Sequence, residues 1–185
     1  MRIGVYGGSF NPPHAGHALV AAWLRWTDRV DEVWLMPAFG HPFDKVNAPF
    51  DVRLALCEAV ASSVGAWVKV CSVERDLPAP SYTIHTLDHL ARAHPAHAFR
   101  LGVGADVLPE TPKWRAWDRI LADYDPIVVG RAGWPTPEGA VDFPGISSTE
   151  IRRRAAAGEP IDALVIAATR DRIQAIYGSG PESVT

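Results

Sequence analysis

The chain has only two cysteines among its 185 residues. Neither Cys57 nor Cys71 has the CxxC or Cys/His spacing of a zinc site or a redox pair, and both thiols are expected to be buried. Long apolar runs are also missing. A membrane span needs about eighteen uninterrupted apolar residues, and the sequence has no such run. No apolar leader precedes the segment Arg2 to Gly8. We therefore expect a cytoplasmic protein without a membrane partner.

A strong net charge is lacking as well. The formal net charge is -3, with 21% charged and 48% hydrophobic residues, which is typical of a soluble globular protein. Nucleic-acid binding would need a local basic patch, so no nucleic-acid partner is expected. The length suits one domain that buries its core without a disulfide or metal. We expect this domain at 1–177 and a disordered tail at 178–185, and the sequence carries no signal for an oligomeric state.

Short apolar runs alternate with stretches of helical periodicity. The runs predict buried strands at residues 3–6, 33–36, 67–70, 99–103 and 127–129. The periodic stretches predict helices at residues 14–28, 50–64, 82–94 and 114–123, followed, after a Gly- and Pro-rich surface connection, by helices at 147–157 and 163–177. The connection covers 130–145. This order is typical of an α/β fold with one doubly wound parallel sheet, whose ligands bind beyond the carboxyl ends of the strands where strand order reverses.

The first predicted strand ends in a Gly-rich turn that leads into a helix with two histidines at its start. Gly7 and Gly8 let the backbone approach a phosphate, and a helix N-terminus attracts an anion. His14 and His17 are three residues apart, so both imidazoles can donate to one phosphate chain. A Gly-Gly pair alone is typical of a tight turn, and a His pair alone of the surface or a partial metal site. Their combination in one strand-turn-helix unit indicates a functional site.

The segment from Gly7 to His17 reads Gly-Gly-Ser-Phe-Asn-Pro-Pro-His-Ala-Gly-His, and it resembles the HxGH signature of the nucleotidyltransferase superfamily. Its Gly-Gly and Asn-Pro-Pro-His parts are most similar to the bacterial nicotinate-nucleotide adenylyltransferases. Relatives that adenylate phosphopantetheine or cytidylylate small phosphates share His-x-Gly-His but usually differ around it. The resemblance implies a Rossmann-like (HUP-type) nucleotidyltransferase domain with a C-terminal helical segment. It also implies His14 and His17 as catalytic residues and a nucleotide-binding turn made of Gly7, Gly8, Ser9, Phe10 and Gly16.

A second motif stands ahead of the predicted helix at 147–157. Ser147 and Glu150 have the spacing of a capping box, which by itself indicates only a well-capped helix. That reading does not explain Arg152 on the first turn, where a cation opposes the helix dipole. The motif resembles the second superfamily signature, Ile-Ser-Ser-Thr-x-Ile-Arg, which implies that the β- and γ-phosphates are held by Ser147, Ser148 and Arg152. The two arginines that follow are expected to be solvated charges.

The fourth predicted strand ends in glycines and an acidic residue. A carboxylate at this place can accept both ribose hydroxyls, although an Asp is also a common helix cap. In the resembling family a Gly-x-Asp holds the adenosine. The resemblance therefore implies that Gly104 and Asp106 bind the nucleotide.

Two further segments resemble the acceptor site of the nicotinate-nucleotide enzymes. They are the Ser-Tyr-Thr turn, with Ser81, Tyr82 and Thr83, and the tryptophan-bearing segment 113–117. An electron-poor pyridine ring stacks well on indole, and backbone N–H groups or a cation would select its carboxylate. Two tryptophans three apart could instead be core residues of one helix. We expect Trp117 to contact the ring and leave Trp114 open.

This chain departs from the family pattern at two places. Gly40 to Lys45 stands where the family often has Pro-Pro-His-Lys after the second strand, and Lys45 is expected to reach the phosphates as a catalytic cation. His85 stands where many relatives have an acidic residue.

The resemblances imply an enzyme that joins nicotinate mononucleotide to the α-phosphate of ATP and releases pyrophosphate, a step of NAD biosynthesis. No protein nucleophile is needed, because a phosphate monoester is already ionised near neutral pH. Mg²⁺ is expected to be held mainly by the ATP phosphates, without a protein metal site. Two alternatives stay open. One is a sibling enzyme for nicotinamide mononucleotide, phosphopantetheine or CTP, and the other is a catalytically silent nucleotide-binding module that regulates a partner.

Overall fold

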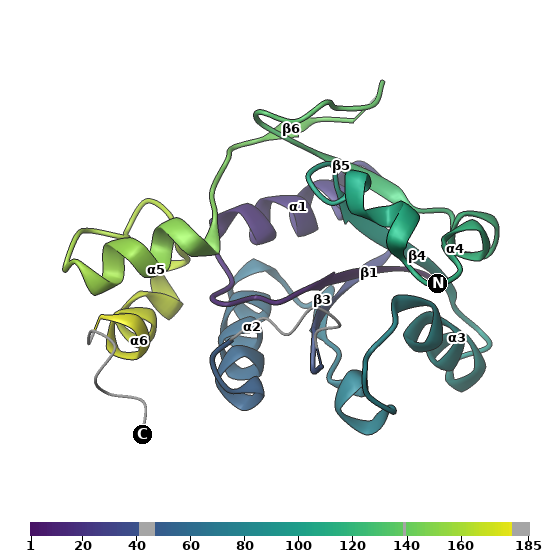
Figure 1. Ribbon diagram of the computed structural model, residues 1–185, viewed down its shortest axis with the longest axis horizontal. Coiled ribbons are helices and arrows are strands. Elements are labelled where there is room, and N and C mark those ends of the chain that lie inside the picture. Colours follow the sequence, from purple (N-terminus) through teal and green to yellow (C-terminus); the bar gives the residue numbers. More distant parts are fainter. Residues whose placement is uncertain (41–46, 139, 179–185) are drawn as a thin grey trace.

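A six-stranded, all-parallel sheet forms the centre of the protein, with strand order β3-β2-β1-β4-β5-β6 (Figure 1). The computed structural model describes residues 1–40, 47–138 and 140–178. The strands are β1 (Arg2–Gly8), β2 (Glu32–Pro37), β3 (Val68–Val70), β4 (Ala98–Gly104), β5 (Ile127–Arg131) and β6 (Asp142–Phe143). The chain builds β1, β2 and β3 outward on one side and then returns to place β4 beside β1. Strand order therefore reverses between β1 and β4, where such sheets bind ligands.

Helices cover both faces of this sheet. The α-helices are α1 (Ala15–Trp26), α2 (Phe50–Val64), α3 (Thr83–Ala93), α4 (Trp117–Tyr124), α5 (Ser148–Ala156) and α6 (Ala167–Tyr177), and two 3-10 segments are η1 (Val73–Asp76) and η2 (Leu108–Lys113). One core cluster joins α1 and α2 to the sheet, and a second joins α3 and α4 to its other face. Neighbouring residues of β2 alternate between them, with Leu35 in the first cluster and Met36 in the second. Both faces of the strands are buried, which explains why the predicted strands are continuous apolar runs.

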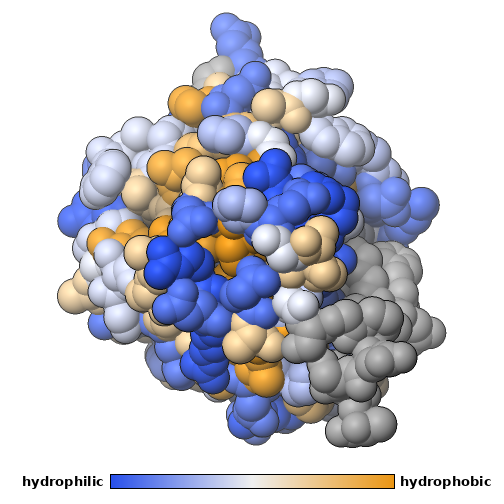
Figure 2. All heavy atoms as spheres, turned by 90° about the vertical axis from the view of Figure 1, so that its left-hand side faces the viewer, coloured by the Kyte–Doolittle hydropathy of each residue, from blue (hydrophilic) through white to orange (hydrophobic). Residues whose placement is uncertain are grey.

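A third core cluster attaches the C-terminal helices to α2. Ile151 of α5 and Ile173 of α6 are fully buried against Leu56 of α2. In Figure 1, α5 and α6 lie on the side of the molecule opposite the N-terminus. Figure 2 shows this side as a mainly hydrophilic surface with smaller hydrophobic areas between the polar residues. The predicted helical segment at the C-terminal end is therefore confirmed, and it packs on α2.

The predicted α/β fold is confirmed, and three of its strands and α-helices were not predicted or begin more than two residues from the predicted position. The connection at 130–145 contains the edge strand β6, whose two residues pair with Gly130 and Arg131 of β5. A two-residue strand is too short to show a periodic pattern. The last helix begins at Ala167 rather than 163, because Ile161 and Val165 are buried in a turn that packs on α2 and α5. The helix predicted from 114 begins at Trp117, after the 3-10 segment η2.

The predictions from cysteine and hydropathy can be compared with the described residues. Cys57 is buried, Cys71 is partly buried, and both are free thiols. In the described ranges, none of the helices has the length and apolar content needed to cross a membrane. The predicted disordered tail at 178–185 lies outside the described residues except for Gly178.

Candidate active site

The carboxyl ends of β1 and β4 border a cleft of about 800 Å³. Its walls include the turn after β1 (7–9), the end of β4 (101–104) and the turn before α3 (81–83). A smaller cavity of about 70 Å³ also contains Gly104 and Asp106 in its wall, so the two cavities adjoin there. The Gly-rich turn, the Gly-x-Asp segment and the Ser-Tyr-Thr turn predicted from the sequence are thus parts of one site.

The two histidines of the first motif lie in the wall of the smaller cavity. His14 is the N-cap residue of α1, and its backbone N–H donates to Nδ1 of His17 over 3.0 Å. The two imidazole rings stack with centroids 3.7 Å apart and planes inclined by 26°. Since Nδ1 of His17 accepts this hydrogen bond, the neutral ring carries its proton on Nε2. Nε2–H is then free to donate to a ligand.

Burial determines the charge of this pair. Desolvation, and then the positive charge of Arg131, lower the pKa of His14 to about 4. Desolvation, the neighbouring His14 and Arg131 lower the pKa of His17 well below its usual value. Both rings are therefore neutral at neutral pH, and they offer N–H donors rather than fixed positive charges. A bound phosphate chain would raise both pKa values by supplying negative charge.

The glycine between the histidines and the phenylalanine before them have packing roles. A Cβ atom added at Gly16 would lie 3.0 Å from Nδ1 of His14, so a side chain there would displace the imidazole. Phe10 is 2% exposed, and its ring lies 4.7 Å from that of His17. Phe10 therefore supports His17 from the core. Nδ1 of His14 is buried and has no hydrogen-bond partner among the described residues, as expected for a group that meets a ligand.

The second motif packs directly on the first. Oγ of Ser148 donates to the carbonyl oxygen of Pro12 over 2.8 Å, and a guanidinium N–H of Arg152 donates to that of Asn11 over 2.6 Å. Oγ of Ser147 accepts a hydrogen bond from the backbone N–H of Glu150 and so caps α5. The fold therefore brings together two motifs that are about 140 residues apart in sequence. The phosphate-binding roles of Ser147, Ser148 and Arg152 stay predictions.

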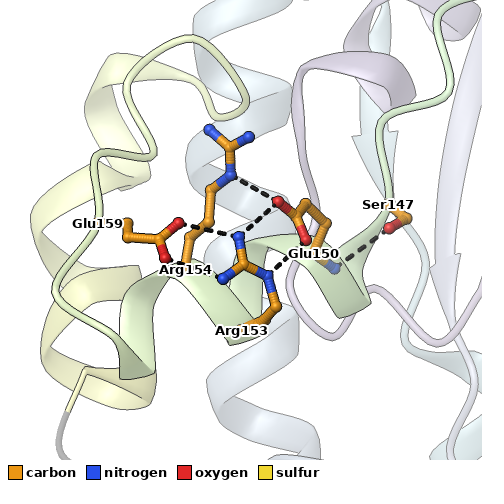
Figure 3. A network of polar contacts seen from close by, with 5 residues as sticks. All are labelled: Ser147, Glu150, Arg153, Arg154 and Glu159. Carbon is orange, nitrogen blue, oxygen red and sulfur yellow. Dashed lines mark hydrogen bonds and ion pairs between the residues drawn. The ribbon is translucent and has the colours of Figure 1, made fainter.

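The two arginines after Arg152 belong to a separate ion-pair network on α5, shown in Figure 3. Arg153 and Arg154 both contact the carboxylate of Glu150, and Arg153 also contacts Glu159, at distances of 2.7–2.9 Å. Hydrogen bonds from the two guanidinium groups lower the pKa of Glu150 to about 2. Of these three arginines, Arg152 is the one that contacts the first motif.

The predicted ribose ligand is paired with a cation from the neighbouring strand. The carboxylate of Asp106 contacts the guanidinium of Arg131, which also donates to the carbonyl oxygen of Ile146 over 3.3 Å. Arg131 stands at the end of β5 in the wall of the smaller cavity. A role for Arg131, which follows the predicted strand at 127–129 by two residues, was not predicted from the sequence. A Cβ at Gly104 would overlap the Asp106 carboxylate, which explains the glycine there.

Comparison with known proteins agrees with this arrangement. The family model of cytidylyltransferase-like proteins matches residues 5–154. A relative from Anaeromyxobacter sp. (strain K), named "Probable nicotinate-nucleotide adenylyltransferase", is 51% identical over 167 residues that cover 89% of each chain. A relative of the same name from Myxococcus xanthus is 38% identical over 166 residues, which cover 89% of this chain and 87% of the relative. The chain belongs to the nicotinate-nucleotide adenylyltransferase branch of the cytidylyltransferase-like family.

A solved structure of the same family name has the same fold. The Plasmodium falciparum nicotinic acid mononucleotide adenylyltransferase complexed with NaAD superposes with a TM-score of 0.80 at 18% identity, covering 95% of both chains. At 18% identity, this likeness shows that the two proteins share a fold. The shared architecture therefore extends over nearly the whole of both chains.

One buried arginine that was not predicted from the sequence joins three segments of the chain. Arg53 of α2 is 3% exposed, and its guanidinium donates to the carbonyl oxygens of Ala48, Ser9 and Ala38 over 2.8–2.9 Å. Ser9 follows β1 and Ala38 follows β2, and both residues line the cleft. On a helix of ordinary polarity, a single arginine gives no sequence signal for such a role.

The aromatic end of the cleft contains Tyr82, Thr83 and Trp114. Trp117, the predicted ring contact, packs edge-to-face on Trp114 with centroids 5.6 Å apart and does not belong to the cleft wall among the described residues. Glu74, also missed, is buried in the wall and accepts a hydrogen bond from the backbone N–H of Phe39 over 3.0 Å. Ring contact by Trp117 stays a prediction, and Trp114 has the better position for it.

The altered loop after β2 can be described only at its two ends. Lys45, predicted as a catalytic cation, lies outside the described residues. The carbonyl oxygen of Gly40 accepts a hydrogen bond from the backbone N–H of Ser81 over 3.2 Å, and Asn47 accepts one from Nδ2 of Asn11 over 3.0 Å. The loop thus starts beside Ser81 at the aromatic end of the cleft and ends beside the first motif.

Proposed function

We propose that this protein adenylates nicotinate mononucleotide with ATP, giving deamido-NAD and pyrophosphate, in NAD biosynthesis. The observation that carries the proposal is the meeting of the two signature motifs at the point where strand order reverses. The 51% identity to a relative named for this activity supports the choice of acceptor.

The reaction is an in-line substitution at the α-phosphorus of ATP. A phosphate oxygen of the acceptor forms the new bond to that phosphorus, and the bond to the bridging oxygen of pyrophosphate breaks. The acceptor phosphate is ionised at neutral pH, so the protein needs no general base for the attack. Its contribution is to hold both substrates in line and to stabilise the charge that develops on the leaving group.

The neutral histidines suit this second task. Nε2–H of His17 and the buried ring of His14 can donate hydrogen bonds to oxygens that gain charge during transfer. The N-terminus of α1 carries a partial positive charge at the same place. Arg152 contacts the first motif and supplies a full charge there. Arg131 lines the small cavity, where its charge is shared with the carboxylate of Asp106.

The same proposal includes Mg²⁺ as the ion that accompanies ATP. When bound, Mg²⁺ would neutralise phosphate charge. In this proposal the ion is held mainly by the phosphate oxygens of ATP, as Mg²⁺ in nucleotide sites usually is. We also propose a cytoplasmic enzyme whose partners are small molecules, and the net charge of -3 supports the expectation of no nucleic-acid partner.

A mass-spectrometric panel tests the proposed function. ATP, CTP and GTP are each combined with nicotinate mononucleotide, nicotinamide mononucleotide, phosphopantetheine and glycerol 3-phosphate, and the products are identified by mass. We expect deamido-NAD from ATP and nicotinate mononucleotide as the main product. A larger yield from another pair would identify a sibling enzyme, and no product from any pair would favour a silent binding module.

A further inference from the structure

The cleft contains one cation that no acidic group of the described chain neutralises. The charged side chains in its wall are Glu74, Asp106, Glu110, Lys113 and Arg115. Lys113 pairs with Glu110 at 2.9 Å, and Asp106 pairs with Arg131. Within residues 1–40, 47–138 and 140–178, Arg115 takes part in no ion pair. The cleft therefore holds an unpaired guanidinium that can bind an anionic group of a ligand.

Arg115 lies at the aromatic end of the cleft. The central carbon of its guanidinium is 5.1 Å from the centroid of the Tyr82 ring, a cation-π contact that holds the head group against one wall. Trp114, the preceding residue, also lines the cleft. Ala116 has left-handed backbone angles (φ 54°, ψ 43°), and this turn separates Arg115 from Trp117, which starts α4 outside the cleft wall.

We propose that Arg115 is a specificity residue that binds the ring carboxylate of the pyridine mononucleotide acceptor. This inference rests on the proposed function and extends it to a residue that neither signature motif contains. The planar guanidinium presents its N–H donors in a fork that matches a carboxylate, and it has no acceptor. A ring carboxamide is uncharged, and its own NH₂ donors find no acceptor on this group. Arg115 thus favours the acid over the amide.

The position of Arg115 assigns it to the ring carboxylate rather than to the acceptor phosphate. The acceptor phosphate must reach the α-phosphorus beside His14 and His17, in the smaller cavity. Arg115 lines the large cleft and is not in the wall of the smaller cavity as described. The guanidinium lies over the ring of Tyr82, and Trp114 lines the same cleft. An electron-poor pyridine ring is the part of the acceptor that stacks on such aromatic rings.

The experiment compares two acceptors in four proteins. Steady-state kinetics with nicotinate mononucleotide and with nicotinamide mononucleotide are measured for the wild type, R115Q, R115K and the control R119Q. Arg119 is an exposed arginine of α4 that pairs with Asp88 and Asp123 outside the cleft wall, so R119Q removes an equivalent charge close by. Melting temperatures of all four proteins verify that they fold.

We expect R115Q to lower kcat/KM for the nicotinate acceptor about 10- to 50-fold, as for loss of one charge-assisted contact at a partly open site. The change should appear in KM, because the ring carboxylate is remote from the reacting phosphorus. The amide acceptor should change less than about 3-fold, R115K should recover part of the preference, and R119Q should match the wild type.

Two results would overturn the inference. Equal losses for both acceptors would assign Arg115 to a group that they share, namely the phosphate or ribose. An unchanged preference in R115Q would make Arg115 a surface residue. Both outcomes require a wild type that prefers nicotinate mononucleotide, so they differ from failure of the proposed function, in which the wild type itself makes no deamido-NAD.

Discussion

Replacing Arg53 by methionine should destabilise the protein strongly, because this guanidinium joins three chain segments. Its three hydrogen bonds go to carbonyl oxygens of Ala48, Ser9 and Ala38, and burial lowers its pKa. Methionine fills a similar volume but donates no hydrogen bond. In the variant, water from the cleft can reach the carbonyl oxygens of Ser9 and Ala38, which line it. The carbonyl oxygen of Ala48 is away from the cleft and should stay without a partner.

The expected magnitude follows from this partial rehydration. A hydrogen bond to a charged group contributes about 1.5–3 kcal/mol, so losing three of them, with partial recovery by water, should cost roughly 3–5 kcal/mol. A protein of ordinary stability has about 5–15 kcal/mol in total, so Arg53→Met should remain folded at low temperature but lose a large part of its stability. At roughly 2–4 °C for each kcal/mol in a chain of this size, its melting temperature should fall by roughly 10 °C.

Urea unfolding at 15 °C, followed by circular dichroism, measures the free energy of unfolding. Arg53→Lys should lose less, since an ammonium can still reach one or two of the three oxygens. Arg170→Met removes an exposed arginine that pairs with Asp162 and Asp171, and it should change stability by less than about 0.5 kcal/mol. If Arg53→Met unfolds within about 1 kcal/mol of the wild type, the buried arginine does not stabilise the two loops.

Three further predictions concern the phosphate side of the site. His14→Ala and His17→Ala should each lower kcat by about 10²–10³-fold, the effect of removing one preorganised donor, with melting temperatures nearly unchanged; full turnover in the double variant would contradict this role. The pKa of His14 is about 4 in the folded protein and about 6.5 in the unfolded chain. Between these values the unfolded chain binds more protons than the folded protein, so the free energy of unfolding falls as pH falls from about 6.5 to about 4. In phosphate-free buffer, His14→Asn should reduce this loss by about 3 kcal/mol at pH 4, and equal pH profiles would contradict the burial argument. Arg152→Ala should lower kcat/KM for ATP by roughly one to two decades and leave the acceptor KM unchanged, with partial recovery in Arg152→Lys. An unchanged kcat/KM for ATP would mean that Arg152 only donates a hydrogen bond to the carbonyl oxygen of Asn11.

The positions of Trp114 and Trp117 could not be predicted from their spacing in the sequence. A spacing of three residues places Trp114 and Trp117 on one face only if both belong to one helix. The chain instead passes through η2 and the left-handed Ala116 before α4 begins. The two rings stay in edge-to-face contact, but of the two only Trp114 lines the cleft as described. A left-handed alanine is stabilised by its surroundings, and no local propensity predicts it.

The sequence by itself determined the features whose physical cause is local. Continuous apolar runs specified five strands, and helical periodicity specified the order of the helices. The Gly-rich turn with His14 and His17 predicted an anion site, and these residues line the two adjoining cavities. These features depend on residues that are neighbours in the sequence, so they can be predicted without the tertiary structure. The same holds for the cap formed by Ser147 on α5.

Tertiary structure alone decided which distant groups meet. The contacts of Arg53 with Ser9, of Arg131 with Asp106, and of Arg152 with Asn11 join residues between 25 and 141 positions apart. Their energy depends on burial and on the order of the strands, since an arginine in water forms no such lasting contact. Only the folded sheet excludes water from these groups. The charge state of the histidine pair follows from the same burial, and it too is a property of the fold rather than of the motif.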